Sequence, residues 1–218
     1  MPSADRTVLP DGSRRVAAAV VVLAVTIFAV LAVRYAGEST AGGVDGHLDR
    51  AVDALPATGH GLARAVTVFG SPPVVTVAAG ALALLCLLAR KPRGALLAVA
   101  GPGLTGLVTT FGKPVVDRTI GREESLAFPS GHTGGATSLA LVCALLLAAA
   151  LELRARDTLL LAAAGAVVAG GAVGTGMVMG GAHYPTDVVG GFCTAVAAVL
   201  GVALALDAVL LRRTALRR

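Results

Sequence analysis

The sequence predicts an all-α membrane protein, a bundle of six transmembrane helices with both chain ends in the cytoplasm. Three observations lead to this fold class. Of the 218 residues, 56% are hydrophobic and 14% are charged, whereas soluble domains carry about 25% charged residues. The apolar residues gather in six stretches, each about as long as a transmembrane helix. The basic residues fall in short clusters between these stretches.

Each apolar stretch is close to the length of about 20 residues that a helix needs to cross the bilayer. The stretches are residues 16–33, 73–89, 94–112, 136–151, 158–179 and 187–211. They are rich in glycine and alanine, which let helices approach closely in lipid. We expect the first stretch to stay in the protein as an anchor, because its 18 residues exceed the apolar core of a usual signal peptide.

The basic residues predict how the helices are oriented. If the chain starts in the cytoplasm, 12 of the 18 lysines and arginines lie on the cytoplasmic side, as the positive-inside rule requires. We therefore expect a cytoplasmic segment at 1–15, a membrane domain at 16–211 and a basic cytoplasmic tail at 212–218. Residues 34–71 form the main outer loop, in which the apolar spacing predicts short amphipathic helices.

The same composition excludes several other classes of protein. So much apolar surface excludes a disordered chain. The net charge of +5 is not gathered in one patch, so we expect no nucleic-acid partner. Cys86, Cys143 and Cys193 all lie inside apolar runs, which excludes a secreted disulfide scaffold. A transporter is disfavoured because Asp207, near a cytoplasmic end, is the one carboxylate well inside a predicted span.

Polar residues collect at the predicted outer ends of the third, fourth and sixth spans. The three clusters are residues 113–122, 128–135 and 181–187, and they hold two of the four histidines. Anchoring of a helix end at the membrane interface would explain any one of these clusters alone. Three on one side of the membrane indicate a functional site.

Two of these clusters have the residue types that hold a phosphate group. Lys113 and Arg118 supply cations for the phosphate oxygens. Ser130, Gly131 and His132 form the turn that opens the fourth helix, whose backbone N–H groups and positive end attract an anion. The spacing therefore predicts a phosphate site between these span ends.

The histidines supply the remaining chemistry. Asp187 follows His183 by four residues, close enough for its carboxylate to bind one imidazole nitrogen and leave the other free to attack phosphorus. His132 lies on a separate helix and is suited to protonate a leaving alkoxide. The pattern predicts phosphoryl transfer through a histidine.

These residues resemble the motifs of the type 2 phosphatidic acid phosphatase superfamily, whose membrane members have six spans. The Pro-Ser-Gly-His motif of that family is complete at 129–132, its final motif matches at His183 and Asp187, and its first lysine matches Lys113. The resemblance covers roughly residues 94–192 by motif.

The resemblance also implies roles for the matched residues. His183 is then the nucleophile, Asp187 its orienting partner and His132 the general acid. Ser130 and Gly131 join Lys113 in holding the phosphate. No metal and no other cofactor is implied.

Two arginines of the family pattern are absent from this chain. Ile120 and Met177 occupy their positions. Arg118 matches an additional arginine of many members, and Arg122 lies two residues beyond the first missing one. Either Arg118 and Arg122 replace the lost cations, or the site binds phosphate weakly and acts slowly or not at all. Three acidic residues beside these arginines have no assigned role: Asp117, Glu123 and Glu124.

We expect a multi-pass protein of the cell membrane, with its active site on the extracytoplasmic face. The expected activity is metal-independent hydrolysis of a phosphomonoester or diphosphate of a lipid, through a phosphohistidine intermediate. Phosphatidate, phosphatidylglycerophosphate and polyprenyl diphosphates are the substrates considered. The alternative is a catalytically impaired lipid-phosphate-binding or structural membrane protein on the same scaffold. The oligomeric state stays open.

Overall fold

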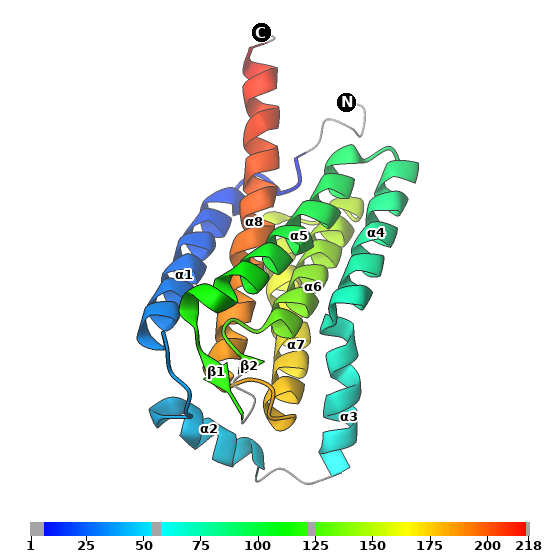
Figure 1. The fold of residues 1–218 in the computed structure, drawn as a ribbon. Coiled ribbons are helices and arrows are strands. Elements are labelled where there is room, and N and C mark those ends of the chain that lie inside the picture. Colours follow the sequence, from blue (N-terminus) through cyan, green and yellow to red (C-terminus); the bar gives the residue numbers. More distant parts are fainter. Residues whose placement is uncertain (1–6, 54–57, 122–124, 217–218) are drawn as a thin grey trace.

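The computed structural model describes residues 7–53, 58–121 and 125–216, which form a bundle of long helices (Figure 1). In chain order the helices and strands are α1 (Ser13–Arg34), α2 (Gly43–Asp53), α3 (Thr58–Thr67), the short 3-10 helix η2 (Val68–Gly70), α4 (Pro72–Leu88), α5 (Pro92–Val116), β1 (Thr119–Ile120), β2 (Ser125–Leu126), α6 (Gly131–Ala150), α7 (Ala155–Met179) and α8 (Pro185–Ala215).

The predicted all-α membrane bundle is confirmed. Helices α1, α5, α6, α7 and α8 are each long and apolar enough to cross a bilayer. The sixth candidate is the pair Gly61–Gly70 and Pro72–Leu88, which meet at a bend of 51° and together pass the same test. Prolines at the start of α4 cause the break, because they cannot continue the hydrogen bonds of the preceding turn.

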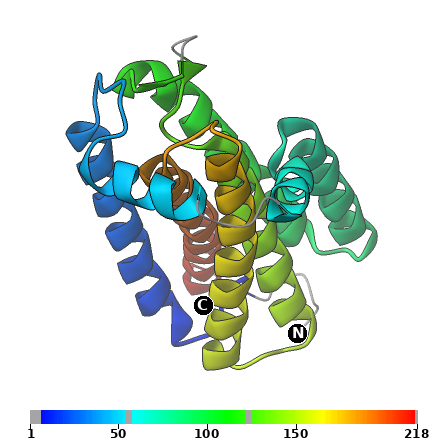
Figure 2. The same cartoon turned by 90° about the horizontal axis from the view of Figure 1, so that it is seen from below.

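The two ends of the bundle differ in structure. Helix α1 begins and α8 ends at the same end (Figure 1), as an even number of crossings requires. The opposite end, the loop end, carries α2 and the antiparallel pair β1–β2. Helix α2 lies across this end, against α7 and α8 (Figure 2). Both α2 and α3 fall in the segment 34–71, where the sequence predicts amphipathic helices.

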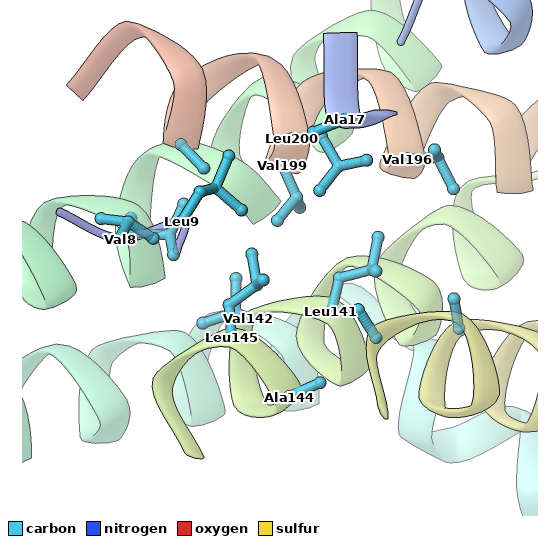
Figure 3. Packing of buried hydrophobic residues seen from close by; sticks show 14 of the residues in the cluster. Val8, Leu9, Ala17, Leu141, Val142, Ala144, Leu145, Val196, Val199 and Leu200 are labelled. Atoms are coloured by element: carbon cyan, nitrogen blue, oxygen red, sulfur yellow. The ribbon is translucent and has the colours of Figure 1, made fainter. Parts of the chain in front are cut away.

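The main apolar core lies between α1, α5, α6, α7 and α8. Val142 of α6 and Val199 of α8 are fully buried in it. Glycines let these helices meet. At Gly101 of α5, the side chains of Val142 and Val199 occupy the space that a larger residue would need. Val8 and Leu9, which precede α1, also pack into this core (Figure 3).

A buried carboxylate holds the residues before α1 in place. Asp207 of α8 is fully buried and accepts hydrogen bonds from the backbone N–H groups of Val8 (2.7 Å) and Leu9 (3.0 Å). Arg14 lies 3.5 Å from the same carboxylate. Asp207 therefore has a structural role, which agrees with the sequence argument against a transporter.

Replacing this carboxylate should release the start of the chain. We expect Asp207→Ala to lower the free energy of unfolding by about 1–3 kcal/mol, because two buried N–H groups lose their acceptor. Trypsin should then cut faster at Arg14 and Arg15. Limited proteolysis in detergent measures this, with Asp157→Ala as control because that carboxylate is exposed at the start of α7, far from Arg14 and Arg15 in the sequence. Equal digestion of both variants would contradict the assignment.

Candidate active site

The histidines predicted to be catalytic line one cavity. It has a volume of about 770 Å³, and His132, His183, Lys113 and Gly131 lie on its wall. The rest of the wall is mostly apolar and comes from α4 and α5. The structure therefore brings residues of all three predicted polar clusters together. They come from the end of α5, the start of α6 and the start of α8.

Close packing positions the start of α6. Ser130 caps the helix, since its side chain accepts a hydrogen bond from the N–H of Thr133 (3.4 Å). Gly70 of η2 touches the carbonyl of His132 so closely that an added Cβ would lie 2.1 Å from that oxygen. Ser130 also donates its backbone N–H to the carbonyl of Asp187 (3.0 Å). The first turn of α6, whose N–H groups favour an anion, is thus held at the cavity wall.

His183 and Asp187 face each other at the start of α8. Nδ1 of His183 lies 3.7 Å from Oδ2 of Asp187, which is longer than a hydrogen bond, and this nitrogen has no hydrogen-bond partner among the described residues. Oδ2 instead accepts the backbone N–H of Tyr184 (2.8 Å). His183 is 5% exposed and Asp187 is fully buried. His183 and Asp187 are neighbours as predicted, but the predicted hydrogen bond between them is not formed in this structure.

Arg118 is placed differently from the sequence expectation. Its side chain is fully buried and does not line the cavity. The guanidinium donates to Asp187 (2.5 Å), to Asp45 (2.6 Å) and to Thr186 (2.7 Å). Burial lowers the pKa of Arg118, but the hydrogen bonds and charges of Asp45 and Asp187 outweigh it and hold the pKa above its usual value. In this structure Arg118 therefore binds carboxylates, and its contact with a phosphate remains a prediction that the geometry does not favour.

The other predicted phosphate-binding residues are distributed as follows. Lys113 reaches the cavity and donates to the carbonyl of Leu126 (2.7 Å). Gly131 lines the cavity, whereas Ser130 is fully buried behind it as the helix cap. Arg122 lies outside the described residues, as do Glu123 and Glu124. Among the described residues of the cavity wall, Lys113 is the one lysine or arginine.

Sequence reasoning missed Asp45, Tyr35 and Thr186. Asp45 lies on α2 and is fully buried. It accepts the backbone N–H of Thr186 (3.0 Å), in the first turn of α8, as well as the guanidinium of Arg118. The rings of Tyr35 and Tyr184 lie 4.2 Å and 4.4 Å from the Arg118 guanidinium. A carboxylate inside a short loop helix gives no local signal of burial, because its partners are far away in the sequence.

Comparison with known proteins identifies the family to which the chain belongs. The family model of the PAP2 superfamily matches residues 69–209, well over half of the chain. The chain belongs to the PAP2 superfamily. A search of curated proteins finds no match.

One similar solved structure is a transmembrane PAP2-type phosphatidylglycerophosphate phosphatase from Bacillus subtilis. It is 20% identical, the match covers 91% of this chain and 97% of that one, and the TM-score is 0.59. This likeness supports the fold of a multi-pass membrane protein within the PAP2 superfamily.

The positions of the two missing PAP2 arginines serve the scaffold in different ways. Ile120 is part of β1 and pairs with Ser125. Met177 is buried in a cluster with Ala136 and Val173. At Gly176, the residue before Met177, an added Cβ would lie 2.3 Å from the carbonyl oxygen of Ala63 in α3. Helix α3 thus lies against α7 beside the position where the family pattern has its second arginine.

This packing makes Gly176 sensitive to any side chain. We expect Gly176→Ala to lower the free energy of unfolding by about 1–3 kcal/mol, because the backbone of α3 must move. Gly171→Ala is the matched control, since it lies on the same helix with nothing within 4 Å of an added Cβ. Thermal unfolding in detergent compares the two variants. Equal midpoints would contradict the close approach of α3 and α7.

Proposed function

We propose that this protein is a membrane phosphatase that hydrolyses a phosphomonoester or diphosphate of a lipid at an extracytoplasmic site. The observation that carries the proposal is the single cavity that combines His132, His183 and Lys113 with an apolar wall from α4 and α5. Membership of the PAP2 superfamily supports phosphatase chemistry in general.

The lipid substrate is argued from the cavity wall. Apolar residues of α4 and α5 line most of it, and among them Val99, Leu107 and Phe111 are more than half exposed. A cavity whose rim faces the hydrocarbon region lets the tails of a lipid stay in apolar surroundings. The phosphate then lies at the end that holds Lys113 and the histidines.

The proposed reaction has two steps. Nε2 of His183 attacks phosphorus while the bond from phosphorus to the leaving oxygen breaks, and His132 gives that oxygen a proton. Water then attacks phosphorus, the P–N bond breaks, and His132 takes the proton of the water. The products are inorganic phosphate and the lipid alcohol, or a lipid monophosphate when the substrate is a diphosphate.

Lys113 and the first turn of α6 are the proposed phosphate-binding groups. A cation and helical N–H groups both stabilise the phosphoryl oxygens as charge develops. This set is smaller than the family pattern, because Arg118 is held by carboxylates and Met177 is packed in an apolar cluster. This smaller set of phosphate-binding groups favours a second candidate function, in which the protein binds a lipid phosphate with little or no turnover.

Phosphate release by the purified protein distinguishes the two candidates. The panel is phosphatidate, phosphatidylglycerophosphate, a polyprenyl diphosphate and water-soluble glycerol 3-phosphate, each with and without a chelator. We expect release from a lipid, no effect of the chelator, and a loss of about 10²–10⁴-fold in His132→Ala and at least as much in His183→Ala.

His47→Ala is the matched control, because His47 is exposed on α2 and its ring contacts Arg50. This variant should keep the parental rate. Full activity of His183→Ala would refute the phosphatase mechanism. Saturable binding of the lipid phosphates without release would establish the binder instead.

A further inference from the structure

We propose that Asp45 on α2 is a positioning residue of the active site, which acts through Arg118 to keep a surplus negative charge on Asp187 beside His183. The inference rests on the proposed function, which it extends from the cavity wall to an outer-loop helix. Asp45 does not line the cavity, so its effect reaches the reacting atoms only through its neighbours.

The contacts form one continuous chain from α2 to the nucleophile. Asp45 accepts from Arg118 (2.6 Å), and Arg118 donates to Oδ1 of Asp187 (2.5 Å). The other oxygen of Asp187 faces Nδ1 of His183 at 3.7 Å. Asp45, Arg118 and Asp187 are all fully buried. Interactions between such groups are screened far less by water and salt than those on a surface.

The charges of this cluster do not balance. Arg118 is paired with two carboxylates, those of Asp45 and Asp187, so the cluster holds one negative charge in excess. Without Asp45, Arg118 would neutralise Asp187 alone. A buried surplus charge is costly unless a charge of opposite sign lies nearby. Lys113 interacts with the charge of Asp187 from α5, and Nδ1 of His183, 3.7 Å from the carboxylate, is a second group able to carry a positive charge beside it.

This surplus suits the proposed reaction. When Nε2 bonds to phosphorus, the imidazole that keeps its Nδ1 proton becomes positively charged. Asp187 stabilises that positive charge less when its own negative charge is neutralised by Arg118. Because Asp45 also binds the guanidinium, Arg118 neutralises Asp187 only in part. Asp45 thereby favours the phosphorylated state of His183 over the free imidazole.

Other charged groups around His183 act in the opposite direction. Lys113 from α5 and His132 from α6 line the same cavity as the imidazole. Both oppose a positive charge on it. On the negative side, Asp187 is on the same segment as His183, and Asp45 acts from α2. A change at Asp45 alters the balance between these positive and negative groups around His183.

The test is the pH–rate profile of Asp45→Asn. This variant keeps the shape of the side chain and removes its charge. We expect kcat to fall about tenfold or more, with KM little changed because Asp45 is remote from the lipid. The acid limb of the profile should move about one pH unit lower, because the imidazole then loses its proton more readily.

Glu38→Gln is the matched control, since it removes a carboxylate that pairs with exposed Arg34 on the same side of the protein. Its profile should coincide with that of the parent. Thr186→Val removes the hydroxyl that donates to Asp45 and accepts from Arg118 but keeps every charge, so it should lower the thermal midpoint without moving the acid limb. If the acid limb of folded Asp45→Asn stays at the parental pH, Asp45 is only structural and the proposal is wrong.

A double variant tests the charge balance even if Asp45→Asn fails to fold. Asp45→Asn with Arg118→Gln removes one charge of each sign and restores the single negative charge at Asp187. We expect its acid limb to return to the parental pH, with part of the lost kcat recovered where the single variant is measurable. A double variant whose limb stays displaced from the parental position would overturn the proposal.

The two proposals fail in distinguishable ways. If the parent releases no phosphate from any substrate, the phosphatase function fails. The role of Asp45 is then tested by histidine-selective NMR, with the His183 resonance identified by its absence in His183→Ala. Titration of that resonance at lower pH in Asp45→Asn supports the effect of Asp45 on His183, and an unchanged titration refutes it.

Discussion

The buried guanidinium of Arg118 is the interaction on which the loop end of this protein depends. It joins Asp45 of α2 to Asp187 of α8, between the rings of Tyr35 and Tyr184. An arginine without partners in this position would cost several kcal/mol, so both carboxylates help to hold the loop end closed. The start of α8 is thereby fixed, and with it the relation between His183 and Asp187.

The start of α8 in turn fixes the start of α6. The carbonyl of Asp187 accepts the N–H of Ser130, and Gly191 lies directly against the carbonyl of Ser130. Gly70 touches His132 from the other side. Two helices that are far apart in the chain therefore present their histidines to one cavity. Backbone contacts of this kind leave little freedom for either histidine to shift relative to the other.

The use of Arg118 in the scaffold explains why the cavity has few cations. Arg118 would serve phosphate only by leaving two carboxylates buried without it. Lys113 and the first turn of α6 remain for the anion, as far as the described residues extend. The position of the second missing arginine has a similar effect, because Met177 is packed there in an apolar cluster with Ala136 and Val173. Structural and anion-binding demands thus compete for the same positions.

The sequence by itself determined the transmembrane helices, the shared side of the termini and which two histidines meet at the cavity. These features depend on local composition, since an apolar run of sufficient length is stable only as a helix in lipid, and on a motif of adjacent residues. Tertiary structure alone decided the partners of Arg118, the burial of Asp45 and the apolar surroundings of Met177. Asp45 and Arg118 are 73 positions apart, and an ion pair depends on distance in space, which the order of residues does not encode locally.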